Sequence, residues 1–236
     1  MIIQLAGLNI EIKHNYKYLP YMCKDYIIND CDHIDISISI TNEEIKNSID
    51  SLNGYPDYYI ESNICYRKIV HELYKFDAIM LHGSSIKYKD KAYIFTAISG
   101  TGKSTHTELL IKNYPSEISY INGDKPIIRY LNEGFYVFGT PWNGKEGYGE
   151  NTSALLDSIV YLERDKDNSV SLMPKDKIIS FIIQQIIYPD DLEEMDKTLD
   201  ILSKIINSTN NYNLKCNMED EAAKCTYKNI LNKELK

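Results

Sequence analysis

The chain has 236 residues, 43% hydrophobic and 25% charged, and a formal net charge of −8. These values are those of a globular protein, and a negative chain without a basic patch argues against a nucleic-acid backbone as partner. Apolar runs fall well short of the roughly 20 residues that span a bilayer. The N-terminal segment lacks the pattern of a signal peptide, so we expect a cytoplasmic protein that binds no membrane. Self-association is left open.

Five cysteines occur at irregular spacing, and none belongs to a C-x-x-C pair. In a cytoplasmic chain this pattern favours reduced thiols over disulfides. A zinc site formed by Cys23, Cys31 and His33 is the alternative.

The N-terminal residues predict a small β-rich lobe over residues 1–58. Residues 2–12 alternate loosely around a glycine, as at the start of a hairpin. Residues 33–40 alternate strictly, which predicts a strand with one buried face formed by Ile34, Ile36, Ile38 and Ile40.

A helix and two turns are expected next to this lobe. Thr41 and Glu44 have the spacing of a capping box at the start of a short helix. A turn is predicted at 53–56 and an amphipathic helix at 60–74.

A strand-like run over residues 78–86 is interrupted by His82 and Gly83. A histidine on such a strand is a candidate acid, base or phosphate contact. A hydrogen-bonded core histidine is the alternative, and the pattern by itself favours it.

The most informative stretch is residues 91–124. An apolar strand (92–97) is followed by the loop AISGTGKS (97–104) and an amphipathic helix that begins at Lys103. This order matches the phosphate-binding pattern G-x-x-x-x-G-K-[ST], with Ala97 in place of the first glycine. A glycine-rich turn without a ligand is the alternative.

Each residue type in this loop has a separate physical reason. Gly100 and Gly102 let the backbone turn with positive φ, so that successive N–H groups can surround an anion at the positive end of a helix. Lys103 can reach the β- and γ-phosphates of ATP, and the Ser104 hydroxyl can bind Mg²⁺. The predicted nucleotide-binding residues are Ser99, Gly100, Thr101, Gly102, Lys103, Ser104 and Thr105.

A second apolar strand (118–121) ends in Asn122-Gly123-Asp124. Ligands of open α/β sheets lie beyond the carboxyl ends of strands, so Asp124 is a candidate Mg²⁺ ligand. Asn-Gly-Asp is also good turn chemistry, which is the alternative.

A predicted hairpin (127–138, turning at 132–134) leads into a glycine-rich loop over residues 139–151. Long loops in compact domains are usually functional or disordered, and we interpret this one as a substrate loop rather than a mobile connector. Its candidate residues are Thr140, Trp142, Gly144, Lys145, Glu146, Glu150 and Asn151.

The remaining residues predict one α/β core over 59–236. The expected elements are a strand at 158–162, helices at 175–187 and 192–206, a strand at 214–216 and a helix at 219–235.

Four motifs in this order resemble the small bacterial kinases related to HPr kinase/phosphorylase. The motifs are His-Gly-x-x-Ile at 82–86, SGTGKSTH at 99–106, NGDKP at 122–126, and GTPW-x-GKE at 139–146 followed by Asn151. The resemblance covers about residues 60–230. It implies a P-loop core of the HPr kinase/phosphoenolpyruvate carboxykinase type, a mixed sheet with flanking helices.

The resemblance also implies an ATP- and Mg²⁺-dependent kinase that transfers the γ-phosphate to a hydroxyl. The acceptor would be a serine-type hydroxyl of a protein or peptide, or a free amino acid or metabolite. HPr kinase/phosphorylase carries two adjacent Asp residues at the strand end, one as base and one for the metal, whereas this chain has Gly123 and Asp124. Asp124 keeps the metal role, and the base is left open among His82, Glu146, Glu150 and Asp124.

Other roles and functions stay open at this point. Lys145 or Arg129 could face the γ-phosphate, and Trp142 could line the acceptor pocket. One alternative function is that of a carboxykinase-like enzyme acting on a keto acid. Another is that of a non-catalytic nucleotide sensor, in which Gly123 marks a lost active site.

Overall fold

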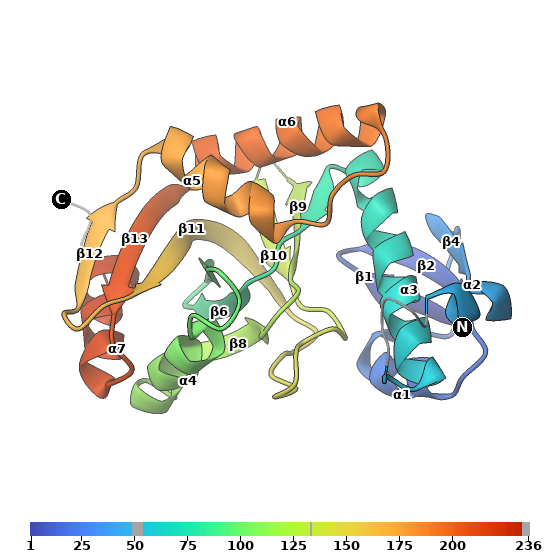
Figure 1. Ribbon diagram of the computed structural model, residues 1–236, viewed down its shortest axis with the longest axis horizontal. Helices are drawn as coiled ribbons and strands as arrows, with labels where there is room; N and C mark the ends of the chain where they lie inside the picture. The colour runs from blue at the N-terminus through green and yellow to red at the C-terminus, as the bar shows by residue number, and fades with distance from the viewer. Residues whose placement is uncertain (49–53, 133, 233–236) are drawn as a thin grey trace. The chain divides into compact units, whose positions relative to one another are not determined.

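The computed structural model describes residues 1–48, 54–132 and 134–232, and the chain divides into two compact units, Met1–Phe76 and Asp77–Lys236 (Figure 1). The expected boundary at residue 58 falls inside helix α3 (Asp57–Leu73), which belongs to the first unit. Ile60, Cys65 and Ile69 are buried along this helix. Because such a face needs partners, the helix stays with the sheet whose core it completes.

The first unit contains a sheet in the order β3-β1-β2-β4. Its strands are β1 (Ile2–Leu5), β2 (Leu8–Lys13), β3 (Ile27–Ile28) and β4 (Ile36–Ser39). Ala6 and Gly7 both have positive φ, 51° and 73°, which makes the tight turn of the predicted hairpin. Short helices α1 (Tyr18–Met22), η1 (Lys24–Tyr26), α2 (Asn42–Asn47) and η2 (Tyr74–Phe76) complete the unit.

Two predictions for this unit differ in outcome. The capping box of α2 is confirmed, since Thr41 and Glu44 exchange both hydrogen bonds. The buried face predicted for residues 33–40 is wrong at Ile34, which is 37% exposed. Pairing with β2 begins only at Ile36, so Ile34 precedes the strand and is not held against the core.

The second unit contains a mixed sheet, which confirms the predicted α/β class. Within the described residues the path is β5-β9-β10-β11-β7-β6-β8, with β13 beside β11 and β12 beside β13. Strand β11 pairs in parallel with β7 and β13, and the other pairs are antiparallel. The strands are β5 (Ala78–Met80), β6 (Ser84–Tyr88), β7 (Lys91–Thr96), β8 (Ile118–Asn122), β9 (Ile127–Leu131), β10 (Gly134–Phe138), β11 (Ser153–Arg164), β12 (Ser169–Leu172) and β13 (Asn210–Cys216).

The parallel strands decide where the loops of this unit meet. Because β7, β11 and β13 run in one direction, their carboxyl ends lie at the same edge of the sheet. The loop that starts at Ala97 therefore shares that edge with Arg164 and Cys216. Strand β11 is longer than the predicted 158–162, and β12 was not predicted at all.

Helices cover both faces of this sheet (Figure 1). Helices α4 (Lys103–Asn113) and α7 (Asp220–Thr226) pack on one face over a cluster that includes Phe95, Val160 and Leu214. Helices α5 (Lys175–Ile182) and α6 (Leu192–Ser208) cover the other face, where Phe181 stacks on Tyr161 with ring centroids 4.1 Å apart. Val160 and Tyr161 are neighbours in β11, and the alternation of a strand sends them to opposite faces.

Helix ends differ from the predictions in two places. The helix predicted for 175–187 ends at Ile182 and continues as the 3₁₀ turn η3 (Ile183–Gln185). After α7 the chain continues as the π-helical turn η4 (Tyr227–Leu231). The predictions for residue 53 of the first turn, residue 133 of the hairpin and the helix end beyond 232 lie outside the described residues. Among the described helices, none is long and apolar enough to cross a membrane.

Candidate functional site

The strand, loop and helix predicted around Lys103 are all present. Strand β7 ends at Thr96, and α4 begins at Lys103. Gly100 and Gly102 have φ of 79° and 114°, values that residues other than glycine rarely adopt. No side chain caps α4. Its first N–H groups, at Lys103, Ser104 and Thr105, therefore have no partner within the described residues and point out of the helix toward the loop.

Lys103 lies beneath this loop and is only 8% exposed. Its ammonium donates to the carbonyl of Ala97 at 3.1 Å, so the side chain folds back under the residues that precede it. Burial lowers the pKa of Lys103, and the charge of the Asp124 carboxylate opposes that shift. The loop thus contains a buried cation that, within the described residues, donates to a neutral carbonyl.

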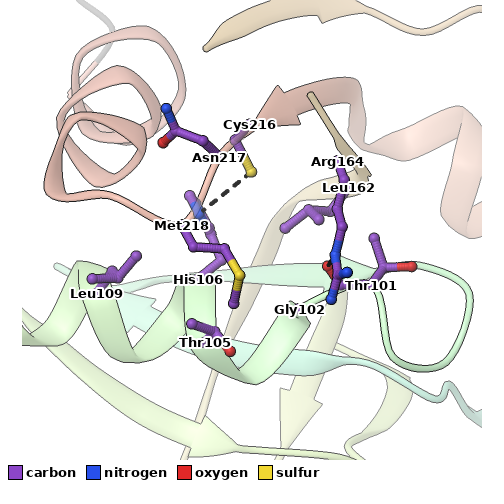
Figure 2. A pocket seen from close by; sticks show the side chains of 10 residues that line it. All are labelled: Thr101, Gly102, Thr105, His106, Leu109, Leu162, Arg164, Cys216, Asn217 and Met218. Carbon is purple, nitrogen blue, oxygen red and sulfur yellow. Dashed lines mark hydrogen bonds between the residues drawn. The ribbon is translucent and has the colours of Figure 1, made fainter. Parts of the chain in front are cut away.

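Arg164, which the sequence analysis did not single out, holds the loop from outside. Its Nε donates to the carbonyl of Thr101 at 2.8 Å and its Nη2 to that of Gly100 at 2.6 Å. It reaches from the end of β11 toward Thr101 and Gly102 (Figure 2). In the sequence, the one feature that could have indicated this role is a cationic residue at the end of a strand. The predicted strand ended two residues before Arg164, so the feature was not visible.

His106 anchors the same helix on its buried side. Its Nε2 lies 2.9 Å from the hydroxyl of Thr226, and its Nδ1 lies 3.8 Å from Sγ of Cys216 (Figure 2). Burial lowers the pKa of His106 to about 4, so the imidazole is neutral at physiological pH. It therefore ties α4 to α7 and β13 as a polar contact without charge.

Asp124 follows β8 and lies between the imidazole of His82 and the ammonium of Lys125. Its Oδ1 is 3.1 Å from Nε2 of His82, and its Oδ2 accepts a hydrogen bond from the ammonium of Lys125. Burial raises the pKa of Asp124, but the hydrogen bonds from His82 and Lys125 outweigh it and hold that pKa well below its usual value. The carboxylate is therefore ionised over the whole physiological range.

His82 is not a core histidine, because its side chain is 34% exposed and directed at Asp124. It lies in the connection between β5 and β6. Its N–H donates to the carbonyl of Gln185 at 2.8 Å, and its carbonyl accepts from the Thr96 hydroxyl at 3.0 Å. These bonds fix the backbone of His82 and place the residue beside β7, the strand that leads into the glycine-rich loop at 97–104.

Asn122 supports Asp124 from below and is fully buried. Its Oδ1 accepts from the N–H groups of Asp124 and Lys125 at 2.9 and 2.6 Å. Its Nδ2 donates to the carbonyl and hydroxyl of Thr140 at 3.0 and 3.1 Å. One side chain thus joins the end of β8 to the start of the 139–151 loop, a role that the sequence analysis did not assign.

The loop over 139–151 packs closely against β8. A Cβ at Gly123 would lie 2.8 Å from the carbonyl oxygen of Asn143 and 3.0 Å from that of Tyr148. Gly123 also donates its N–H to the carbonyl of Tyr148 at 2.7 Å. Position 123 therefore has no room for a side chain in this fold.

The predicted residues of this loop divide into a buried and an exposed set. Thr140 and Trp142 are buried, whereas Lys145, Glu146, Glu150 and Asn151 are exposed. A Cβ at Gly144 would lie 3.2 Å from Cβ of Asp124 and 3.5 Å from Oε2 of Glu146. Asp124 and Glu146 therefore flank the same glycine. Arg129 lies within β9, where it pairs with Ala78 and Tyr136 and not with the residues at the strand end.

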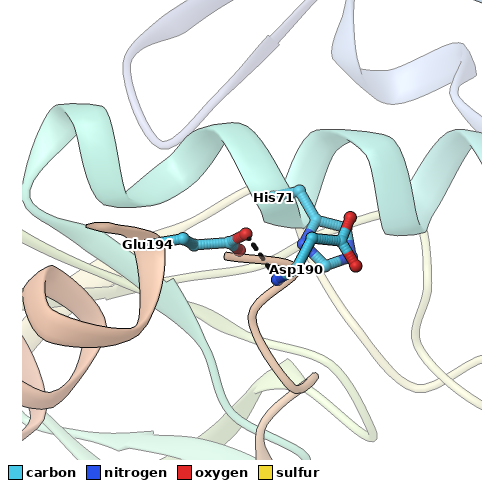
Figure 3. Close-up of side chains that lie close together, drawn as sticks. All are labelled: His71, Asp190 and Glu194. Atoms are coloured by element: carbon cyan, nitrogen blue, oxygen red, sulfur yellow. Dashed lines mark hydrogen bonds between the residues drawn. The ribbon is translucent and has the colours of Figure 1, made fainter. Parts of the chain in front are cut away.

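Two other groups of side chains are accounted for structurally. Cys23 is fully buried, and burial raises its pKa to about 12, while His33 pairs with Asp35 at 3.1 Å. Together with Cys31 they form no cluster of metal-ligand atoms among the described residues. In the second unit, Glu194 accepts from the N–H of Asp190 at 2.9 Å at the start of α6 (Figure 3). His71, also drawn there, belongs to the first unit.

Comparisons with known proteins add little to this geometry. No protein-family model matches the chain, and no curated protein matches it. Among solved structures it is similar to the Hpr(Ser) kinase/phosphatase from Coxiella burnetii, with 10% identity and a TM-score of 0.31. That likeness covers 54% of this chain and 88% of the other. At these values it assigns neither a reaction nor a substrate.

Proposed function

We propose that the second unit is an ATP-dependent phosphotransferase of the P-loop type that moves the γ-phosphate to a hydroxyl. The observation that carries the proposal is the buried ammonium of Lys103 beneath a loop with two left-handed glycines at an uncapped helix start. N–H groups that have no hydrogen-bond partner within the described residues, together with a cation directed at the same point, form a binding site for a polyphosphate chain. Kinases rely on such positioning and charge stabilisation more than on covalent chemistry.

The proposed roles follow the geometry of the loop. The N–H groups at the start of α4 and the Lys103 ammonium bind the β- and γ-phosphates, with Ser99, Gly100, Thr101, Gly102 and Thr105 completing the cradle. In this role Lys103 exchanges the Ala97 carbonyl, a neutral acceptor, for a phosphate oxygen. An ammonium attracts an anionic phosphate oxygen more strongly than a neutral carbonyl oxygen, so the exchange favours the bound state.

Mg²⁺ fits the donors on this side of the loop. Asp124 is ionised and already accepts hydrogen bonds on both oxygens, and the hydroxyl of Ser104 is a hard oxygen ligand of the kind that Mg²⁺ prefers. Ser104 and Asp124 would hold the ion. When bound, it would neutralise charge on the phosphate oxygens.

His82 is the group best placed to take the proton of the acceptor hydroxyl. With Nε2 donating to Asp124, Nδ1 is left as a proton acceptor, and no hydrogen bond to it occurs among the described residues. Gly123 has no room for a second carboxylate, so a base from that position would require the loop to move. Glu146 and Glu150 are alternatives on the exposed part of the loop. The acceptor is a protein serine, a free amino acid or a small metabolite.

One specific observation favours a second candidate, a nucleotide-binding module without transfer. The closed packing at Gly123 removes the position of the usual base, and binding needs only the loop. Both candidates bind the nucleotide. They differ in whether the γ-phosphate is transferred from it to an acceptor.

The test is transfer of label from γ-labelled ATP to free serine, free threonine, small alcohols and a cell lysate. We expect label on one acceptor class, and a loss of roughly three orders of magnitude or more in Lys103→Ala. Lys112→Ala is the matched control, because Lys112 lies on the same helix and is 68% exposed. ATP binding without transfer would favour the second candidate, and normal transfer by Lys103→Ala would refute the proposal.

A further inference from the structure

We propose that Arg164 is a positioning residue that keeps the N–H groups of the loop turned toward the phosphates. The inference rests on the proposed function, because it assigns to Arg164 the job of preparing the loop for a polyphosphate. Arg164 would touch neither the transferred phosphate nor the acceptor.

Arg164 fixes the direction of two peptide groups of the loop. Arg164 binds the carbonyls of Gly100 and Thr101 through two different nitrogens. In a trans peptide the C=O and the following N–H point in opposite directions. The N–H of Gly102 therefore points away from Arg164, toward the start of α4. That of Thr101 is turned inward as well and donates to the carbonyl of Ile98 at 3.2 Å.

These peptide groups would flip easily if nothing held them. Gly100 and Gly102 flank them, and glycine occupies positive and negative φ about equally well. A flipped peptide would direct a carbonyl oxygen at a phosphate oxygen, which is repulsive. The N–H and the hydroxyl of Thr101 both donate to the carbonyl of Ile98, and Arg164 adds the contacts that hold the carbonyls of Gly100 and Thr101 in the binding-competent orientation.

The guanidinium group of Arg164 suits this role by its shape and its charge. Its planar fork can hold two carbonyls at once, whereas an ammonium is a point charge that does not fix two directions. No carboxylate pairs with Arg164 in the part of the chain that the structure describes. Its charge is therefore not neutralised by a partner and also favours an anion in the loop.

A competing role for Arg164 is direct contact with the nucleoside. It lines a small hollow with Leu109 and Met218, and on its other side an open groove of about 390 Å³ with Ile98 and Tyr161. A guanidinium there could stack on a planar base. The two roles differ in the ligand that feels the mutation, because inorganic tripolyphosphate has no base.

The experiment measures binding of Mg·ATP and of magnesium tripolyphosphate by titration calorimetry to the wild-type chain, Arg164→Ala and Arg164→Lys. We expect both ligands to weaken by about tenfold or more in Arg164→Ala, the change that the loss of one charged hydrogen bond gives. Arg164→Lys keeps the charge but should weaken both ligands too, because it cannot hold both carbonyls. Millimolar guanidinium chloride should restore part of the affinity of Arg164→Ala.

The control is Lys166→Ala, which removes the same charge two residues away from an exposed side chain. It should leave both affinities within about twofold of the wild type, as expected for a screened surface charge. Thermal melting of each variant shows whether it is folded; should Arg164→Ala melt early, Arg164→Lys carries the comparison.

Three results would overturn the inference. Weaker ATP binding with unchanged tripolyphosphate binding would assign Arg164 to the nucleoside. Unchanged binding of both ligands would show that the loop needs no external support. A wild-type chain that binds neither ligand would refute the proposed function itself, a result distinct from the other two.

Discussion

The Nε2 of His82 lies 3.1 Å from Oδ1 of Asp124, although the two residues follow different strands of the sheet. His82 lies in the short connection between β5 and β6, and Asp124 is the second residue after β8. The N–H of Gly83 donates to the carbonyl of Asp124 at 2.9 Å, so backbone and side chains meet at the same point. This pairing fixes the imidazole and leaves its Nδ1 for a proton.

Replacing His82 tests whether this nitrogen accepts the acceptor's proton. In His82→Gln the amide can still donate to Asp124 but cannot take up a proton at neutral pH. We expect kcat to fall about 10²- to 10⁴-fold with little change in KM for ATP, as for the loss of a general base. Steady-state kinetics with the acceptor that takes the label in the transfer screen would measure this, and His33→Gln, in the first unit, serves as the control. A rise in KM of similar size, without a fall in kcat, would instead show that His82 contributes to binding and not to proton transfer.

Asn122 is predicted to support both the site and the loop. In Asn122→Ala, the N–H groups of Asp124 and Lys125 lose their common acceptor in a buried place. We expect the free energy of unfolding to fall by about 2–4 kcal/mol, the cost of several unsatisfied buried groups. Urea denaturation followed by tryptophan fluorescence would measure it. Asn122→Asp, which keeps the acceptor but loses the donors to Thr140, should lie between; equal stability of all three proteins would contradict the role.

Gly123 is predicted to be required for packing alone. A methyl group there would press on the carbonyls of Asn143 and Tyr148, so Gly123→Ala should lower the free energy of unfolding by about 1–3 kcal/mol and displace the loop. Gly147→Ala is the contrasting control, since nothing lies within 4 Å of its Cβ position and only its φ of 70° opposes a side chain. In Gly147→Ala the free energy of unfolding should fall by only about 1 kcal/mol. Limited proteolysis of the loop would separate them, and a fully stable Gly123→Ala would refute the packing argument.

His106 predicts how stability depends on pH. Its pKa in the folded chain is about 4, below the value of about 6.5 of an unfolded histidine. Because the unfolded chain binds the proton first, this contribution is fully present above pH 6.5 and is lost as the pH falls toward 4. The loss from this group is about 3 kcal/mol.

The measurement compares urea denaturation of the wild type and His106→Gln from pH 7 to pH 4. Glutamine can replace the hydrogen bond to Thr226 and does not titrate. The variant should therefore show a weaker loss of stability over this range, by about 3 kcal/mol. Parallel pH curves for the two proteins would show that His106 does not titrate as its burial indicates.

Local patterns in the sequence were sufficient for most elements of the second unit. The start of α4 at Lys103 and the strands before and after it were predicted closely, because glycines, apolar runs and helix periodicity act over a few residues. The capping box of α2 is local in the same way. Errors occurred where the outcome depends on distant partners, as for Ile34, for the length of β11 and for the short edge strand β12.

The sequence by itself determined the loop, its lysine and glycines, and the aspartate after the next strand, because each follows from neighbouring residues. Only the tertiary structure decided that His82 contacts Asp124 and that Asn122 joins the end of β8 to the 139–151 loop. It alone also decided that Arg164 binds the glycine-rich loop at 97–104. These contacts join residues far apart in the chain. Their existence depends on strand order and register, which pairing between distant strands sets and local propensity does not.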